Sequence, residues 1–175
     1  MILHKAIIDD LPALSAIMDA SIDNLLTPFL NGDQIAASRE FMGIDSQLIK
    51  DGTYLKCIQN EEIVGCGGWS NRSTLFGGDH SKGRDNAFLD PAADAARVRA
   101  MYTHPDHIRK GIGRMVLKGC EDEARKVGFS KTLLVATLSG EKLYAREGYR
   151  PVKKITEIAS NGVEVPFIHM EKSLT

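Results

Sequence analysis

The residues best suited to chemistry lie in one short stretch, His104–Arg114, which holds two glycines and three cationic side chains. The stretch follows a strand-like run and opens an amphipathic pattern that is typical of a helix. The first amides of a helix have no partner within it, and the helix dipole is positive at that end. We therefore expect a phosphate or diphosphate to bind the backbone amides of Lys110, Gly111, Ile112, Gly113 and Arg114. Charge-assisted contacts are expected from Arg109, Lys110 and Arg114.

Two common phosphate-binding loops do not fit this stretch. A Walker loop needs a Gly-Lys-Ser/Thr run, and none follows Gly111. The dinucleotide fingerprint G-x-G-x-x-G needs a third small residue at the position of Val116. About twenty residues further on, where that fold places an acid, the chain has Lys131-Thr132-Leu133. A nucleotide-dependent oxidoreductase is therefore disfavoured.

The glycine stretch resembles the acetyl-CoA-binding signature of the GCN5-related N-acetyltransferases, Gln/Arg-x-x-Gly-x-Gly/Ala. Gly111 and Gly113 match its two small positions, while Ile108 stands at the first position and Arg109 follows it. Downstream, the segment Leu143–Tyr149 is similar to the Leu-Tyr-x-x-x-Gly-Phe/Tyr segment that closes the active site of this family.

The resemblance extends upstream and covers about residues 1–155. Asp51–Tyr54 and Val64–Trp69 are similar to the central hairpin of the family. In that family two parallel strands splay apart, and the pantetheine arm of acetyl-CoA lies in the gap. The resemblance therefore implies acetyl-CoA as co-substrate, with pantetheine bound by the backbone of the strand end at Met101, Tyr102 and Thr103.

Tyr144 is the candidate catalytic residue, because the resemblance places it beside the thioester sulfur. A phenol has a reference pKa of about 10 and a thiol one of about 8.5, so a tyrosine can donate to a departing thiolate. In the family the tyrosine at this position is the general acid, or at least a hydrogen-bond donor to the sulfur. Many family members carry an Asn shortly after the strand that ends near Thr137. Here Thr137 or Ser139 can replace it with a hydroxyl, or the contact is made by backbone alone.

The general base and the acceptor site are not identified by any motif. An ammonium substrate must lose a proton before attack, and the candidates for accepting it are Asp94, His80 and a water chain to solvent. The polar segment 71–93 reads as a long loop that lines the acceptor pocket, with Trp69 at its edge. Within that loop Arg72 is a candidate for holding an acceptor carboxylate.

These residues predict an N-acetyltransferase that acts by direct attack of a primary amine, carried by a small molecule or by a peptide or protein. The alternative is a non-catalytic acyl-CoA sensor of the same fold. Fold alone does not decide between them. A homodimer is also compatible with the family and with the predicted hairpin edges.

Composition narrows the class of protein. The chain has 175 residues and a formal net charge of −1, which predicts neither nucleic acid nor membrane as a partner. No apolar run approaches the ~20 residues of a membrane span, and no signal-peptide pattern follows Met1. The three cysteines lack C-x-x-C spacing, which indicates reduced, buried thiols in a cytoplasmic protein. The five histidines lack metal-ligand spacing, so no metal is expected.

Hydrophobic periodicity predicts a single α/β domain over residues 1–175. Predicted strands are 3–7, 54–59, 63–69, 97–103, 131–137, 155–158 and 163–170. Predicted helical segments begin near 11, 35, 46, 114 and 140. Strand, glycine loop, helix and strand between 97 and 137 form one parallel βαβ crossover in a mostly antiparallel mixed sheet, with helices on both faces. Asn161-Gly162 predicts a type I′ turn in the last hairpin.

Overall fold

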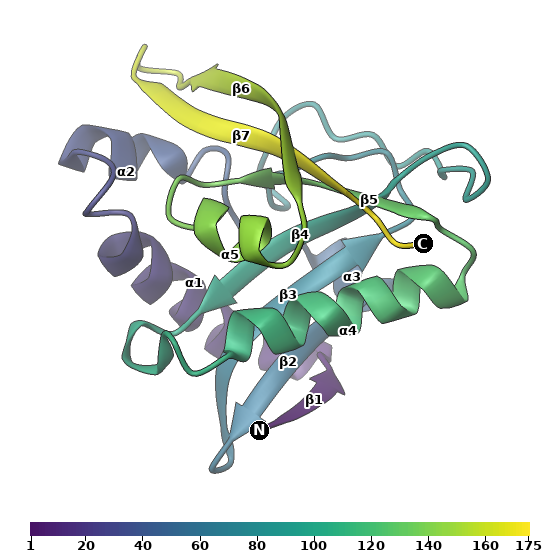
Figure 1. Cartoon of the computed structure of the whole chain (residues 1–175). Coiled ribbons are helices and arrows are strands. Elements are labelled where there is room, and N and C mark those ends of the chain that lie inside the picture. The colour runs from purple at the N-terminus through teal and green to yellow at the C-terminus, as the bar shows by residue number, and fades with distance from the viewer.

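The computed structural model describes residues 1–175, which form one seven-stranded sheet in the order β1-β2-β3-β4-β5-β7-β6 (Figure 1). Every neighbouring pair is antiparallel except β4 and β5, which are parallel. The mixed sheet and its parallel crossover are therefore confirmed. The strands are β1 (Ile2–Lys5), β2 (Tyr54–Gln59), β3 (Glu62–Ser70), β4 (Ala96–Thr103), β5 (Lys131–Ala136), β6 (Arg150–Ile158) and β7 (Glu164–Ser173).

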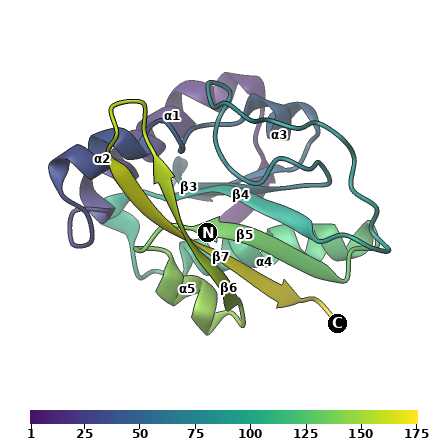
Figure 2. The same cartoon turned by 90° about the horizontal axis from the view of Figure 1, so that it is seen from above.

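Helices cover both faces of the sheet, as predicted (Figure 2). On one face lie α1 (Leu11–Leu25), α2 (Gly32–Ser38) and α3 (Ser46–Lys50). On the other lie α4 (Ile112–Lys126) and α5 (Glu141–Arg146). Short 3-10 turns at Ile8–Asp10 and Pro105–His107 precede α1 and α4. No helix combines the length and the apolar character needed to cross a membrane.

The helix α4 shows how a local pattern produces this packing. Its apolar stripe of Val116, Leu117, Cys120 and Ala124 is buried against the sheet, as helical spacing predicts. Gly128 follows the helix with φ +105°, a left-handed conformation that glycine adopts without strain, and so ends α4. The three cysteines are buried and unpaired.

The parallel pair β4–β5 is joined only at its start. Ala96 pairs with Thr132 and Arg97 with Leu133, and no later residue of β4 has a β5 partner. The two strands diverge toward the ends that lead into the glycine loop and α5 (Figure 1). A register shift between β3 and β4 accompanies this, with Ala100 at φ +50°. The backbone of β4 from Val98 onward is thus open toward β5.

Two local predictions on hairpins were wrong. The last hairpin is not a type I′ turn, because only Gly162 has a positive φ (+83°). Gly162 N–H donates to Ala159 O at 2.8 Å and closes a four-residue turn, and Gly162 itself is the left-handed residue at the end of that turn. Two consecutive positive φ angles occur instead at Asn60 (+50°) and Glu61 (+67°), in the β2–β3 hairpin. The strand β6 also begins earlier than predicted, because Pro151 is tolerated on a sheet edge.

Candidate functional site

The glycine loop presents a row of unpaired backbone amides. The amides of Arg109, Lys110 and Gly111 have no backbone acceptor, and Gly111 is the N-cap of α4. Met115 N–H donates to Gly111 O at 3.0 Å, so the amides of the three residues before Met115 lie in the first turn and have no partner within the helix. Arg109 (φ +61°) and Gly111 (φ +83°) are left-handed and turn this row toward one side. The arrangement suits an anion.

The two glycines of the loop have different physical roles. Gly111 needs its positive φ, and a Cβ added there would meet nothing within 4 Å. Gly113 has an ordinary φ, but a Cβ there would lie 2.9 Å from Leu143 Cδ2. Gly113 therefore lets α5 pack onto α4, whereas the space beside Gly111 is open.

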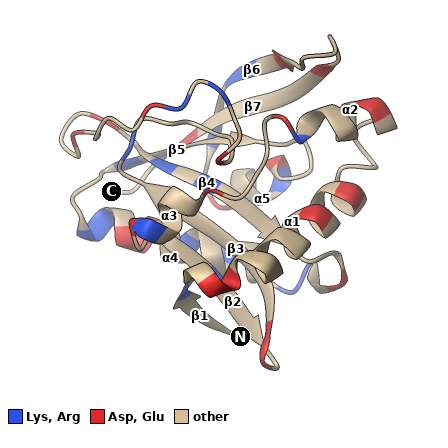
Figure 3. Ribbon diagram, turned by 180° about the vertical axis from the view of Figure 1, so that it is seen from behind, with Lys and Arg blue, Asp and Glu red and all other residues tan.

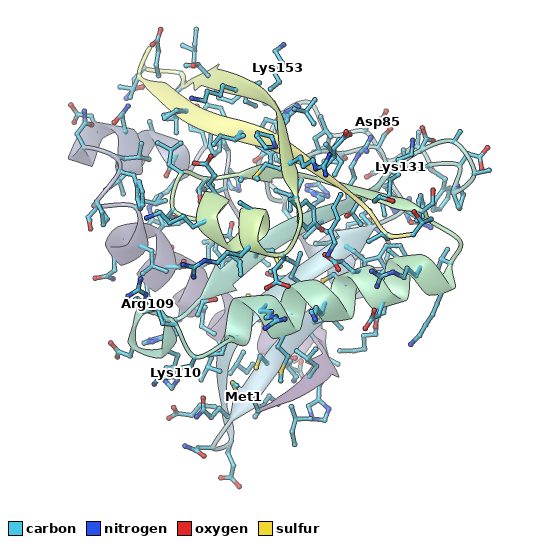
Figure 4. The ribbon with its side chains drawn as sticks, viewed as in Figure 1. Met1, Asp85, Arg109, Lys110, Lys131 and Lys153 are labelled. Carbon is cyan, nitrogen blue, oxygen red and sulfur yellow. The ribbon has the colours of Figure 1, made fainter.

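The three cations of the loop extend along its outer side. Arg109 and Lys110 lie beside each other on the loop (Figure 4). Lys110 Nζ donates to Asp106 O at 3.0 Å, and Arg114 Nε lies 3.1 Å from Glu147 Oε1 on the residue that follows α5. Arg114 remains 60% exposed. These contacts tie Lys110 to the turn before α4 and Arg114 to the end of α5.

The last residues of β4, Met101–Thr103, present backbone groups rather than side chains to a ligand in the gap between β4 and β5. His104 N–H donates to Val64 O at 3.0 Å, so the adjacent Thr103 amide points the other way, toward the gap. The Met101 side chain packs against Val116 on the α4 face, while Tyr102 OH donates to a carbonyl on the opposite face, 3.3 Å away. The side chains of Met101 and Tyr102 thus belong to the core, whereas the backbone of β4 remains available on the side that faces β5.

Tyr144 lies under the place where β4 and β5 separate. Its ring shares a buried cluster with Val98 of β4 and Leu134 of β5, and it packs edge-on against Tyr149 at 5.8 Å. Its hydroxyl has no hydrogen-bond partner and is not enclosed, whereas the hydroxyl of Tyr149 accepts a bond from Thr132 Oγ1 at 2.9 Å. Burial raises the pKa of Tyr144 above its ordinary value of 10, so the phenol stays protonated at neutral pH.

A family model described as the Acetyltransferase (GNAT) family matches residues 20–149. The chain belongs to this family. No curated protein sequence matches it significantly.

Solved structures show the GNAT fold. A GCN5-related N-acetyltransferase of Rhodopseudomonas palustris superposes with a TM-score of 0.71 at 19% identity, over 98% of this chain and 94% of that one. The PaiA N-acetyltransferase of Thermoplasma acidophilum, solved with coenzyme A, gives 0.65 at 16% identity, over 98% of each chain. The Salmonella typhimurium protein YncA, solved with acetyl-CoA, gives 0.66 at 17% identity, over 100% of this chain and 94% of that one.

In this GNAT domain the loop between β3 and β4 is tied down by its own residues. Figure 3 shows it crossing in front of β4. Arg72 forms two bonds to Asp51, with Nε 2.7 Å from Oδ2 and Nη2 2.9 Å from Oδ1, and its guanidinium lies 4.4 Å from the Phe88 ring centroid. Arg72 was a candidate for holding an acceptor carboxylate, but in the structure its guanidinium holds the carboxylate of Asp51 instead. Trp69 is buried in the core, donating to Glu123 of α4 at 2.8 Å, and does not line a pocket under this loop.

The ion pair of Arg72 and Asp51 should make the stability of the folded protein depend on pH. Bonds from Arg72 lower the pKa of Asp51 below its ordinary value. A carboxyl with a lowered folded pKa stabilises the protein above its unfolded pKa of about 3.9, and that contribution is lost as pH falls through the folded pKa. Asp51→Asn should thus lower the melting temperature at about pH 7, and much less at about pH 2.5. An equal loss at both pH values would contradict this.

Each candidate base makes one hydrogen bond to a backbone group. His80 Nε2 lies 2.7 Å from Arg39 O, and Asp94 Oδ2 accepts the Asp90 amide at 2.8 Å. Asp94 also precedes the first residue of β4, at the opposite end of that strand from the glycine loop. A strand of this length spans about 25 Å, so Asp94 lies far from the phosphate end of the site.

The turn between β5 and α5 is held by the hydroxyls of Thr137 and Ser139. Thr137 Oγ1 and Ser139 Oγ lie 3.0 Å apart, and Gly140 N–H donates to Thr137 Oγ1 at 3.3 Å. These contacts fix the start of α5 and hence the place of Tyr144. A Cβ at Gly140 would lie 2.9 Å from Tyr144 Cε2, so a glycine is needed where the ring packs.

One buried charge cluster was missed in the sequence. Asp45, which is fully buried, pairs with Arg99 of β4 at 2.6 Å and with Arg84 at 2.9 Å. Arg99 Nη2 also donates to Gly77 O at 2.9 Å. The cluster thus joins the start of α3, the β3–β4 loop and β4. The only sequence signal was that Asp45 precedes a short helical pattern as a possible cap, and this carries no information about distant partners.

No group of three or more His, Cys, Asp or Glu side chains is arranged to hold a metal ion.

Proposed function

We propose that this protein transfers an acetyl group from acetyl-CoA to a primary amine, carried by a small molecule or by a peptide or protein. Family membership supports acetyl transfer, and two proteins of the same fold have been solved with coenzyme A or acetyl-CoA. The observation that carries the proposal is the row of unpaired amides before α4, which opens onto the empty space at Gly111 and continues into the β4–β5 gap.

The residues fit the parts of this co-substrate. The amides from Lys110 to Arg114 would hold the diphosphate, with Arg109, Lys110 and Arg114 supplying positive charge. The backbone of Met101–Thr103, open toward β5, would bind the amide groups of pantetheine. These contacts fix the direction in which the sulfur enters the gap.

Acetyl-CoA, when bound, supplies an activated thioester. In direct attack the neutral acceptor amine forms a C–N bond as the C–S bond breaks. The Tyr144 hydroxyl, protonated and unbonded, gives its proton to the departing thiolate. In this scheme the proton lost by the acceptor leaves through water.

The alternative is a sensor that binds acyl-CoA without reaction. A sensor needs the glycine loop to bind acyl-CoA, but it does not need a proton donor beneath the gap between β4 and β5. The free Tyr144 hydroxyl therefore favours the enzyme.

The proposal is tested by thermal shift with acetyl-CoA, using a pair of matched glycine variants. Gly111 and Gly162 both have φ +83° and open space around the missing Cβ. Alanine at either position should cost about 1–2 kcal/mol of backbone strain. Wild-type protein and Gly162→Ala should gain about 2.7 kcal/mol at a ligand concentration 100 times Kd, and Gly111→Ala much less.

Turnover is then measured by thiol release with a panel of amines. Absence of any acetyl-CoA-dependent shift in the wild-type protein would remove both the enzyme and the sensor. Binding without thiol release from any amine would favour the sensor.

A further inference from the structure

Arg97 of β4 is a partly buried guanidinium that no carboxylate of the protein neutralises. None of the ion pairs in the chain includes it. Its Nη1 donates to Ala95 O at 2.9 Å, whereas its Nε is enclosed and has no acceptor. Burial lowers the pKa of Arg97 and the charge of Asp94 opposes this, but an arginine stays charged at neutral pH. A charge taken out of water without a partner is costly, which indicates that an anionic ligand completes this site.

The surroundings of Arg97 hold more positive than negative charge. Arg97 and Arg99 are two residues apart on β4 and therefore share one face of the sheet. On that face, Arg99 and Arg84 share the single buried carboxylate of Asp45. Asp45 cannot neutralise both of its partners, and Arg97 adds a further positive charge. This face therefore suits a ligand that carries negative charge.

Arg97 lies at the closed end of the gap between β4 and β5. It forms the last pair of these strands, with Leu133, and they separate from Val98 onward. Val98 and Tyr144 share a buried cluster on the face that carries α4 and α5. Because side chains alternate along a strand, Arg97 projects to the other face, which carries α1, α2 and α3 (Figure 3). The guanidinium and the proposed proton donor thus lie on opposite faces of the sheet at the same point of the gap.

The acceptor has to approach from the face that carries Arg97. The glycine loop leads into α4, so acetyl-CoA would enter the gap from the α4 side with its sulfur near Tyr144. The face away from the co-substrate is then the one left for the amine. Successive residues of a strand are only about 3.3 Å apart, so a carboxylate on Arg97 lies close to the gap at Val98. An amine on the carbon next to that carboxylate reaches the gap, whereas a long spacer would carry it past.

The free end of the Arg97 guanidinium matches a carboxylate. Its Nη2 makes no hydrogen bond and is not enclosed, and Nη1 uses one N–H for Ala95 O. The remaining N–H groups form a planar fork, which can bind both oxygens of a carboxylate. Leu133 and Val135 of β5 lie partly buried on the same face, where an apolar side chain can pack beside them.

We propose, given the acetyl transfer proposed for this protein, that the acceptor is an α-amino acid whose carboxylate binds Arg97 while its amine attacks the thioester. The amine nitrogen forms a bond to the acetyl carbon as the carbon–sulfur bond breaks. The amine loses its proton to water, and Tyr144 protonates the departing thiolate and regains a proton from solvent. The products are an N-acetylamino acid and coenzyme A as its thiol.

Thiol release with matched acceptors tests the role of the carboxylate. Alanine, leucine, phenylalanine, lysine and glutamate are each compared with their α-amide, which keeps the amine and loses the charge. At least one amino acid should react with a kcat/KM about 30-fold or more above that of its amide. An amide loses its ammonium proton more readily than the acid, so reaction without recognition of the carboxylate would favour the amide.

The outcomes separate the acceptor from the reaction. If acetyl-CoA binds and amides or simple amines react as fast as every amino acid, an α-amino acid is not the acceptor, while acetyl transfer stands. A longer ω-amino acid that reacts better than any α-amino acid would also overturn the inference. Absence of acetyl-CoA binding would remove the proposed function itself.

Substitution of Arg97 tests the residue. Arg97→Ala should raise KM for the preferred amino acid about 30-fold or more and leave the thermal shift with acetyl-CoA unchanged. Arg97→Lys keeps the charge but loses the fork, and its KM should lie in between. Arg150→Ala is the matched control, because Arg150 is exposed and its removal changes the net charge equally. Equal KM values for Arg97→Ala and Arg150→Ala would overturn the proposal.

His169 reports binding without turnover. It lies opposite Val135, on the same face as Arg97. Burial lowers the pKa of His169, Lys153 and Arg97 lower it further, and Glu157 opposes them. A carboxylate bound to Arg97 offsets that positive charge, so the preferred amino acid should raise the pKa of His169 in wild-type protein with coenzyme A. NMR titration of the histidine rings measures it. The same rise in Arg97→Ala, or none in the wild-type protein, would contradict binding at Arg97.

Discussion

Tyr144→Phe should lower kcat by about 100-fold or more while KM for acetyl-CoA stays nearly unchanged. The hydroxyl of Tyr144 bonds to no protein group, so its removal breaks no contact of the folded state. It would remove a proton donor that acts only as the thiolate departs. Because burial keeps this phenol protonated, the loss should be constant from about pH 6 to 9. Steady-state thiol release over that range is the measurement.

Tyr149→Phe is the matched control for this experiment. Tyr149 is a buried tyrosine beside Tyr144, but its hydroxyl accepts a bond from Thr132 inside the core. Loss of that bond should reduce stability by about 1 kcal/mol and leave kcat close to wild type. If Tyr144→Phe turned over as fast as Tyr149→Phe, Tyr144 would not be the general acid, and the thiolate would leave unassisted.

Asp45→Asn should cost about 3–5 kcal/mol of unfolding free energy. Asparagine keeps the side-chain oxygen that caps α3, so the change removes charge and little else. Arg99, whose side chain is 3% exposed, and Arg84 would then face each other without a carboxylate between them. Urea unfolding followed by circular dichroism measures the loss. The β3–β4 loop should also become more sensitive to protease.

Asp19→Asn serves as the control, because Asp19 pairs with Arg39 on the surface and is 53% exposed. Exposed pairs contribute at most about 1 kcal/mol. A loss for Asp45→Asn no larger than that of the control would mean that the Arg99–Asp45–Arg84 cluster does not hold the loop on β4.

The two halves of the site differ in how they are built. The side that would receive acetyl-CoA consists of backbone, at the start of α4 and along β4, together with one phenol. The opposite face, under the β3–β4 loop, is held by the salt bridges of Asp45 and Asp51. Backbone recognition fits a co-substrate that family members share, whereas side-chain contacts can differ with the acceptor.

Local sequence determined the elements themselves. The bounds of β2 and the start of α3 agree with prediction. The bounds of β3, β4 and β5 and the start of α4 agree within two residues. Side-chain periodicity and glycine conformation are properties of neighbouring residues, so they can be read without knowing the rest of the fold. Tyr144 was predicted from a short motif that resembles one of the family, and the structure places it in the cluster between β4 and β5.

Tertiary structure alone decided which distant residues meet. Arg72 was expected to hold an acceptor carboxylate but pairs with Asp51, and Trp69 was expected at a pocket but donates to Glu123. Gly113 is needed because Leu143 arrives from another helix. Such partners depend on the order of strands in the sheet and on the face that each side chain takes. Contacts between residues twenty or more positions apart follow from that global arrangement, which no local pattern encodes.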